Sequence, residues 1–365
     1  MRIGVFSMPK VHEKMMMALE KELSIKFIFY RHKNNVFHFS LNSIKMFSKV
    51  EFKEAIDYSL KFFYARNRIK PPLFLLKLYF SIELFFKYIK YSLIIDNKND
   101  LYIFWNGKKP RHLIAIQIIK LLDIKIKYME NGLLPNRLVF DGNGVNFENS
   151  VPRNRRFFEE YTNNLHLPVE LTPRIPKNRN KFSKKVKALP KNFIFVPFQV
   201  DYDSQILLYS PWIKNMVELF NLIEDISNDL DYVFVIKEHP SSNKNYLDLH
   251  KRCEKLEKIE FVNGYSTQEL IEKSQAVMTI NSTVGIESLL FYKKVIVIGD
   301  AFYNIDGITK SAKNRDQLLA VIKSLNDWKF ETSLVENFLK YLYYEYLIPT
   351  DNYNAKQFFE ILSKK

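Results

Sequence analysis

Short apolar runs alternate with amphipathic stretches along most of this chain, and the alternation predicts β-strands and α-helices in turn. In the first half, strands are predicted at 2–8, 25–31, 101–105 and 124–128, and helices at 11–22 and 111–122. In the second half, strands are predicted at 193–198, 232–236, 259–262, 276–280 and 295–298, with helices around 212–226, 245–257, 267–274 and 284–291. This order is typical of parallel sheets covered by helices on both faces. The predicted fold class is therefore α/β, with two Rossmann-like domains.

The length of 365 residues suits two domains, at about 150 residues each. We expect an N-terminal domain over 1–175 and a C-terminal domain over 192–335. The segment 176–191 between them is rich in Pro, Lys and Arg and has no acidic residue, which predicts a basic linker. The aromatic segment 336–365 is predicted to be helical, with a break at Pro349, and to pack back on the domains. Two such domains facing a cleft are the arrangement of a GT-B type glycosyltransferase.

The stretch 61–95 combines many aromatic residues with lysines and arginines. Pro71-Pro72 predicts a break between two helices, because proline is poorly tolerated inside one. Lys77, Glu83 and Lys87 interrupt the apolar run, so it is too polar to span a bilayer. Two interpretations stay open. The hairpin can lie on an anionic membrane surface, or its apolar residues can face the domain core while the lysines are solvated.

The formal net charge of +15 favours an anionic partner. Charge alone does not choose among nucleic acid, anionic lipid and an anionic sugar nucleotide. The single cysteine, Cys253, excludes a disulfide framework and a multi-cysteine zinc site, and fits a reducing compartment such as the cytoplasm. The N-terminal residues read as a strand and not as a signal peptide, which also predicts a cytoplasmic protein.

Polar side chains follow three predicted strands of the C-terminal domain. Gln199, Asp201 and Asp203 follow 193–198, Lys237 and His239 follow 232–236, and Asn281-Ser282-Thr283 follow 276–280. The carboxyl ends of parallel strands lie at one edge of a sheet, where ligands bind, so we expect one shared site.

Each of these groups has a catalytic and a structural interpretation. Side chains alternate along an extended segment, so Asp201 and Asp203 are expected to share a face, with Tyr202 opposite. Such a carboxylate can be a nucleophile, a general base or a metal ligand, or it can cap the next helix. Lys237 and His239 suit a phosphate leaving group, or hydrogen bonds within a turn. Hydroxyls at a helix start, as in Asn281-Ser282-Thr283, bind phosphate or act as N-caps.

In the N-terminal domain, Glu130 lies at the end of a predicted strand. If the domains face each other, Glu130 approaches the cleft from the side opposite Asp203, as an acid/base partner requires. The Gly142-x-Gly144 pair lacks the third glycine and the helix of a dinucleotide fingerprint. The sequence also lacks the G-x-S-x-G turn, which argues against a serine hydrolase.

Five short elements occur in order over residues 100–310: Glu130-x-Gly132, Gly144-Val145-Asn146, Pro197-x-Gln199-Val200-x-x-Asp203, Lys237-x-His239-Pro240, and Asn281-Ser282-Thr283 through Glu287. Together they resemble the capsule polysaccharide biosynthesis and export family, which includes bacterial β-Kdo glycosyltransferases. The resemblance implies a GT-B fold, a CMP-Kdo donor bound by the C-terminal domain, an acceptor on the N-terminal side, and transfer with retention.

The resemblance also assigns roles to single residues. Asp203, rather than Asp201, matches the aspartate that forms the glycosyl adduct, Glu130 matches the acid/base, and His239 with Ser282-Thr283 matches elements that hold the CMP phosphate. Further donor-binding candidates are Gln199, Asp201, Lys237, Asn281 and Glu287. Candidate contacts to acceptor or donor are Asn106, Asn131, Gly132, Arg137 and Asn146. No metal and no cofactor is expected. One departure is that the arginine usual after Glu-x-Gly is replaced by Leu133-Leu134-Pro135, with Arg137 later.

As a single module, the chain looks similar to enzymes that start a Kdo linker on a phosphatidylglycerol-type lipid. The expected partners are a CMP-sugar, a glycolipid or phosphatidylglycerol-type acceptor and the anionic inner face of the bacterial inner membrane, and not nucleic acid. Two other functions stay open. One is an inverting CMP-sialic acid sialyltransferase with Glu130 as base and no adduct. The other is a non-catalytic, membrane-associated capsule assembly or export protein.

Overall fold

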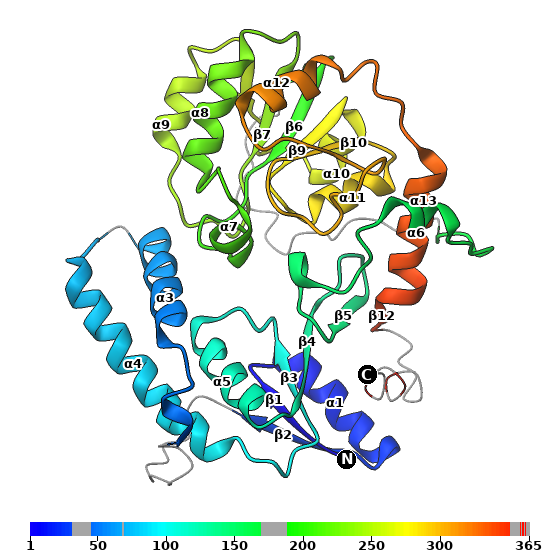
Figure 1. Ribbon diagram of the computed structural model, residues 1–365. Helices are drawn as coiled ribbons and strands as arrows, with labels where there is room; N and C mark the ends of the chain where they lie inside the picture. Colours follow the sequence, from blue (N-terminus) through cyan, green and yellow to red (C-terminus); the bar gives the residue numbers. More distant parts are fainter. Residues whose placement is uncertain are drawn as a thin grey trace. The chain divides into compact units, whose positions relative to one another are not determined.

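The computed structural model describes residues 1–30, 45–67, 69–168 and 188–350, together with Phe358, Glu360 and Leu362. The chain forms two compact units (Figure 1). The first unit contains Met1–Gly132, Asn136–Ser150 and Leu347–Lys365, and the second contains Leu133–Pro135 and Val151–Tyr346. Residues 176–187 of the expected basic linker lie outside the described residues.

The main crossing from the first unit to the second lies at Ser150, whereas the sequence pattern placed the end of the first domain at residue 175. The difference arises because helix α6 (Arg155–Glu160) belongs to the second unit. It packs there on helix α13 (Thr332–Lys340), with the rings of Phe158 and Phe338 5.3 Å apart.

All six strands of the second unit's sheet run parallel. They are β6 (Phe193–Pro197), β7 (Val233–Lys237), β8 (Ile259–Phe261), β9 (Ala276–Thr279), β10 (Lys294–Val297) and β11 (Lys310–Ser311), in the order β11-β10-β9-β6-β7-β8. Counted from β6, this is the strand order of the doubly wound dinucleotide-binding fold. The chain reverses its direction across the sheet between β6 and β9, which makes this pair the topological switch point.

The alternation of side chains along β6 explains the layers of this unit. Ile194 and Val196 are buried with α8 (Met216–Ser227) and α12 (Arg315–Lys323), whereas Phe193 and Phe195 are buried with α10 (Thr267–Lys273) on the other face. The remaining helices are α7 (Ser204–Tyr209), α9 (Leu247–Cys253) and α11 (Val284–Leu290). The sheet is therefore covered on both faces, as the apolar runs of its central strands β6 and β9 predict.

The first unit has a mixed sheet in the order β12-β5-β4-β3-β1-β2. The strands β1 (Arg2–Phe6), β2 (Lys26–Tyr30), β3 (Leu101–Trp105) and β4 (Lys125–Asn131) are parallel. β5 (Arg137–Asp141) and β12 (Ile348–Pro349) pair antiparallel at one edge. Helix α1 (Lys10–Leu23) covers one face together with Phe358 and Leu362. Helices α4 (Leu73–Ile94) and α5 (Pro110–Leu121) cover the other, where Phe6 meets Tyr91 and Phe104 meets His112, and α3 (Phe52–Arg66) packs on both helices.

The predicted fold class is confirmed, since both units are Rossmann-like α/β layers, the construction of GT-B type proteins. The cleft expected between them stays a prediction. The break at Pro71-Pro72 is confirmed, because α3 ends at Arg66 and α4 begins at Leu73. In the segment 336–365, helix α13 continues into a π-helical turn that ends at Tyr346, and β12 follows at the break expected near Pro349; Phe358, Glu360 and Leu362 are again helical. Pro349 lies in this edge strand, where its missing N–H is tolerated.

Candidate functional site

Gln199 and Asn281 join the two loops at the switch point of the second unit. Gln199 follows β6 and Asn281 follows β9, and Gln199 Nε2 donates to Asn281 Oδ1 over 3.0 Å. Gln199 Oε1 accepts from the Asn281 N–H at 3.2 Å, and Asn281 Nδ2 donates to the carbonyls of Gln205 and Tyr209. Both side chains are buried. These amides shape the loops that surround the strand ends, so both residues act as scaffolding for this site.

Asp201 and Asp203 do not share a face, and this expectation is wrong. The segment is a turn, closed by a 2.9 Å bond from the Asp203 N–H to the Val200 carbonyl, so the alternation of an extended strand does not apply. Asp201 is buried, accepts from the Met216 N–H at 2.8 Å at the start of α8, and burial raises its pKa. Asp203 is exposed and is the N-cap of α7, with Oδ1 accepting from the Gln205 N–H at 2.9 Å.

Lys237 and His239 end β7 with different environments. Lys237 Nζ donates to the carbonyls of Asn263 at 3.0 Å and Tyr265 at 2.5 Å, and burial lowers the lysine pKa. These bonds anchor the loop after β8. His239 Nδ1 accepts from the Ser241 N–H at 3.1 Å. A nitrogen that accepts carries no proton, so the neutral ring holds its proton on Nε2, where it can be donated. Lys237 Nζ is thus used to hold a loop, whereas the N–H of the His239 ring is suited to donate to a ligand.

The loop after β9 leads directly into α11. The Ser282 N–H donates to Thr279 Oγ1 at 3.2 Å, and Ser282 Oγ accepts from the Val284 N–H at 3.2 Å. Thr283 is exposed and its side chain makes no capping bond, and Glu287 lies half-buried in the first turn of α11. The Ser282 hydroxyl is therefore used within the turn, whereas the Thr283 hydroxyl lies at the surface beside it.

The Gly285 position in that first turn is sterically restricted. A Cβ there would lie 2.5 Å from Tyr303 Oη, and the buried Tyr303 hydroxyl donates to the Ser282 carbonyl at 2.5 Å. A glycine at this position lets Tyr303 hold the loop from behind.

In the first unit, two amide groups position Glu130 at the end of β4. Asn106, which follows β3, donates from Nδ2 to Glu130 Oε2 at 2.6 Å, and the Asn131 N–H donates to Oε1 at 2.9 Å. Asn106 has a left-handed φ of 64°, and its Oδ1 accepts from the Lys108 N–H at 3.1 Å. The structure thus brings three sequence-predicted residues, Asn106, Glu130 and Asn131, into one group.

Gly132 has a steric role in the tight connection from β4 to β5. Its N–H donates to the Arg137 carbonyl at 2.6 Å, and a Cβ at this position would overlap that carbonyl. Arg137 begins β5 and is half-buried. The Gly132 requirement is therefore explained by backbone packing alone.

Two residues near this group were missed by the sequence interpretation. His12 stacks on Trp105 at 4.6 Å and hydrogen-bonds to Asn131, and burial lowers its pKa. The buried Asp141 accepts from the Asn143 N–H, and from the N–H and hydroxyl of Ser150 at 2.7 Å each, which shapes the loop that contains Asn146. The Asp141-Gly142 pair is a turn signal, but it does not reveal which side chain organises the loop.

Within the described ranges, no group of three or more His, Cys, Asp or Glu side chains is placed to hold a metal ion. None of the helices in that part of the chain is both long and apolar enough to cross a membrane.

The fold and the polar groups at its strand ends define a class of protein, one with two α/β units of the kind that bind ligands at topological switch points. Residues 173–353 match the family described as "Capsule polysaccharide biosynthesis protein", and the chain belongs to this family. The family resemblance inferred from the motifs is thereby confirmed. The matched range contains all candidate residues of the second unit and none of the first.

Two curated relatives are similar to this chain. Protein FixF of Sinorhizobium fredii is 34% identical over 252 residues, which are 67% of this chain and 60% of FixF. Capsule polysaccharide export protein KpsS of Escherichia coli is 32% identical over 147 residues, 36% of each protein. The chain thus matches less than two thirds of either relative. Among solved structures, the KpsC β-Kdo 2,7 transferase of Thermosulfurimonas dismutans aligns over all of both chains, with 14% identity and a TM-score of 0.49.

Proposed function

We propose that this chain is a glycosyltransferase that uses CMP-Kdo as donor, in the synthesis of a capsule polysaccharide or a related surface glycan. The observation that carries the proposal is the position of the polar residues. The groups after β6, β7 and β9 surround the switch point of a Rossmann-type sheet, where ligands bind in such folds. They also lie within the range that matches the family.

The donor phosphate is assigned to the ends of β7 and β9. His239 accepts the Ser241 N–H on Nδ1, so its neutral ring carries the proton that we assign to the phosphate on Nε2, and Thr283 lies at the start of α11. As the bond from the sugar C2 to the phosphate oxygen breaks, negative charge grows on that oxygen, and donors fixed in advance stabilise it. Gln199 and Asn281 act indirectly, by holding the loops that carry these donors.

Asp203 is assigned as the nucleophile. Its bonds to the Gln205 N–H and to the Ser204 hydroxyl both end on Oδ1, which makes Oδ2 the attacking oxygen. Oδ2 bonds to C2 of Kdo while the C2–O bond breaks and its electron pair leaves on the CMP phosphate. An acceptor hydroxyl then attacks C2, its proton passes to Glu130, and the bond to Asp203 breaks. Two inversions at C2 give net retention.

The test is incubation of the full chain with CMP-Kdo and, separately, with CMP-sialic acid. CMP release is followed, and the intact protein mass is recorded for the wild type and Asp203→Asn. A mass increase of one Kdo residue in the wild type only is the expected result. CMP release from CMP-sialic acid alone, without an adduct, would replace the proposal by an inverting sialyltransferase. Turnover of neither donor, with and without phosphatidylglycerol vesicles as acceptor, would favour a non-catalytic assembly protein.

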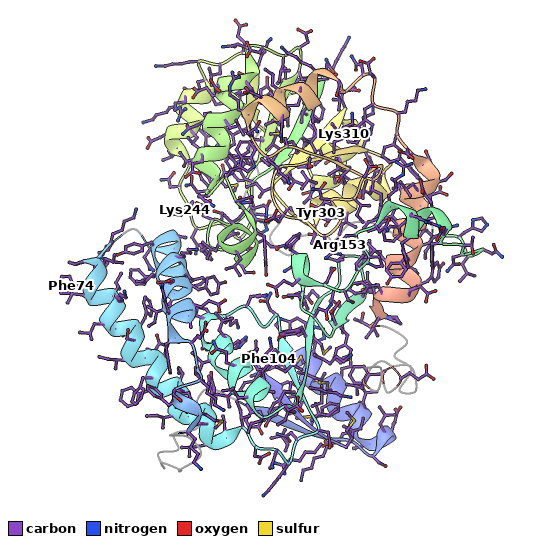
Figure 2. All side chains as sticks on the ribbon, viewed as in Figure 1. Phe74, Phe104, Arg153, Lys244, Tyr303 and Lys310 are labelled. Carbon is purple, nitrogen blue, oxygen red and sulfur yellow. The ribbon has the colours of Figure 1, made fainter. Side chains whose placement is uncertain are left out.

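The proposed place of action is the anionic inner face of the bacterial inner membrane, and helix α4 supports it. Leu73 at the start of α4 is exposed, and seven further apolar side chains of this helix are 37% to 69% exposed: Phe74, Leu75, Leu78, Tyr79, Ile82, Phe85 and Phe86. At about 100° per residue these seven fill an arc of about 140° with no charged residue among them. The opposite side, with Leu76, Phe80, Leu84 and Tyr88, is buried. Figure 2 shows Phe74 extending from α4.

An apolar arc of this size on a helix that already buries its other side is expected to meet an apolar phase. Lys77 lies near one border of the arc and Lys90 lies at the other, beside Glu83 and with Lys87 farther round the helix, so these lysines can meet anionic headgroups. The buried side of α4 agrees with the core interpretation of 61–95, and the exposed apolar side supports the proposed membrane contact.

Vesicle co-sedimentation tests this surface. Phe74→Ser with Leu78→Ser is expected to weaken binding to phosphatidylglycerol vesicles about tenfold or more, because each side chain contributes about 1.5–3 kcal/mol when buried. The control is Val11→Ser on α1, which removes an apolar side chain that is 68% exposed elsewhere in the same unit. Equal binding by the double variant and the wild type would refute the surface. A wild-type dimer that the double variant dissociates would assign α4 to a second copy of the chain.

A further inference from the structure

The first unit has a switch point of its own, which none of the roles above uses. β1 lies between β2 and β3, and the chain leaves β1 toward β2 before it returns to β3 on the other side. Ser7 follows β1, and helices α1 and α5 begin close to these strand ends, at Lys10 and Pro110. Ligands bind beyond the carboxyl ends of strands at such a point.

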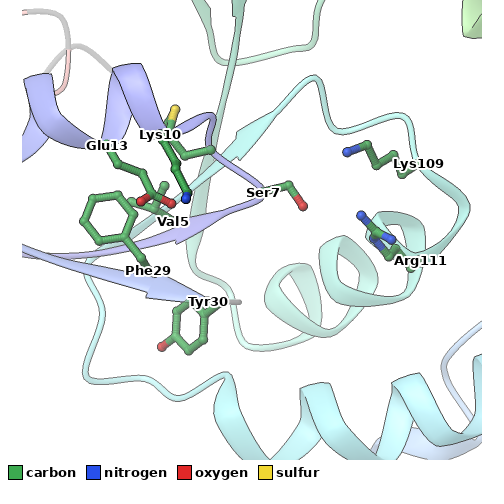
Figure 3. A pocket seen from close by; sticks show the side chains of 9 residues that line it. Val5, Ser7, Lys10, Glu13, Phe29, Tyr30, Lys109 and Arg111 are labelled. Atoms are coloured by element: carbon green, nitrogen blue, oxygen red, sulfur yellow. The ribbon is translucent and has the colours of Figure 1, made fainter. Parts of the chain in front are cut away.

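A pocket of about 330 Å³ lies at this position, within the first unit alone (Figure 3). Its polar lining is Ser7, Lys10, Glu13, Tyr30, Lys109 and Arg111. Three cationic side chains thus face one carboxylate. Figure 3 shows the Ser7 hydroxyl, the Lys109 ammonium group and the Arg111 guanidinium around one space, with Glu13 and Lys10 on the other side of the pocket. The charge of the Lys109 side is therefore positive.

Among the described residues no carboxylate forms an ion pair with Lys109 or Arg111. The charges of Glu130 on Lys109 and of Glu83 on Arg111 act only from a longer distance. Arg111 Nε is buried and has no hydrogen-bond acceptor in the same part of the chain. Burial lowers the pKa of Lys109 and of Arg111, and Arg111 lowers that of Lys109 further. Two desolvated like charges destabilise each other, and a bound anion removes this cost.

The Ser7 hydroxyl is held in place at the same pocket. Its Oγ lies 2.9 Å from Nε2 of the fully buried His112. Ser7 has a left-handed φ of 58°, a conformation that residues other than glycine keep only where the surrounding structure imposes it. Ser7 thus adds a neutral, fixed group to the two cations.

We propose that this pocket binds an oxyanion, a phosphate ester or a carboxylate, with Arg111 and Lys109 as counter-charges and Ser7 as a further hydrogen-bonding group. We assign this oxyanion to the acceptor. That assignment rests on the proposed function, in which the second unit binds the donor. A phosphate monoester and a carboxylate share this chemistry, and the experiment separates them.

The test uses the full chain and two probes with the same three-carbon skeleton, sn-glycerol 3-phosphate and glycerate. Binding is measured by line broadening of the probe in nuclear magnetic resonance, with and without CMP. The variants Arg111→Gln and Lys109→Gln are expected to weaken binding of the preferred probe about tenfold or more, because charge-assisted hydrogen bonds are lost. The control Lys120→Gln removes an exposed lysine at the far end of α5 and is expected to change nothing.

The thermal midpoint separates a binding role from a structural one. Without ligand, Arg111→Gln is expected to leave the midpoint unchanged or to raise it, because desolvation is the largest effect on this cation and it has no ion pair among the described residues. Three results would overturn the proposal: neither probe binds the wild type, both variants bind as the wild type does, or CMP displaces the probe. Failure of CMP to stabilise the wild type would contradict the assigned nucleotide site and leave the measurement of the pocket intact.

Discussion

Substitution of Asp203 separates a helix cap from a nucleophile. Asp203 Oδ1 accepts the Gln205 N–H at 2.9 Å and caps α7. Replacement of an aspartate N-cap by alanine costs about 1 kcal/mol, whereas asparagine caps as well as aspartate. In a unit of roughly 200 residues, 1 kcal/mol lowers the thermal midpoint by about 2–4 °C. Asp203→Ala is therefore expected to be less stable by that amount, and Asp203→Asn to match the wild type.

Activity is expected to follow a different order from stability. Both variants lack the attacking carboxylate, so CMP release from CMP-Kdo should fall at least about a thousandfold in each. The assay combines CMP release, intact mass and a thermal melt on the same preparations. Asp201→Asn serves as the control, since it keeps Asp203 and is expected to form the adduct. An adduct that persists in Asp203→Asn, or that disappears in Asp201→Asn alone, would refute the assignment of Asp203.

Two further predictions concern stability. Burial raises the pKa of Asp201 in the folded chain above its ordinary value of 3.8. The ionised Asp201 side chain therefore lowers the free energy of unfolding at pH 7. This cost disappears as the pH falls through the folded-state pKa, because the folded chain then takes up the proton. Asp201→Asn is thus expected to be at least as stable as the wild type in urea at pH 7 and to lose any advantage near pH 4; a loss at pH 7 alone would contradict this. Gly132→Ala is expected to cost about 1–3 kcal/mol in urea unfolding, because the Cβ overlaps the Arg137 carbonyl. Gly142→Ala is its control, since no atom lies within 3.7 Å of a Cβ there, and equal stabilities of the two would show that the β4–β5 connection adjusts.

Most of the parallel strands could be predicted because each contains a short apolar run whose burial follows from local sequence; the two-residue β11, Lys310-Ser311, has no such run and is not predicted. All five residues of β6 are buried, as its composition indicates. β5 and β12 could not be predicted in this way. β12 has only two residues, and its pairing of Ile348 with Leu138 joins positions far apart in the chain. Such non-local pairing leaves no periodic signal in the sequence.

The location of the candidate site was predicted better than the roles of its members. Strand exits place Gln199 and Asn281 at the same edge of the sheet, and their hydrogen bond shows that they meet there. The sequence does not show that the side-chain amides of Gln199 and Asn281 hydrogen-bond to each other, because that bond depends on the distance between two loops. The same limit applies to Asp201, whose burial depends on where α8 begins. Lys109 and Arg111 stand out only once β1 and β3 are seen as neighbours.

The return of the chain to the first unit has a consequence for biosynthesis. Ile348, Phe358 and Leu362 belong to the apolar core of that unit, yet they follow the whole second unit in the sequence. Ribosomes add about 5–20 residues per second, so the roughly 200 residues after Ser150 take on the order of 10 to 40 seconds to make. During that interval the nascent first unit exposes the β5 edge and the apolar surface that these residues later cover. A nascent-chain chaperone that shields this surface would therefore act on the first unit until translation is nearly complete.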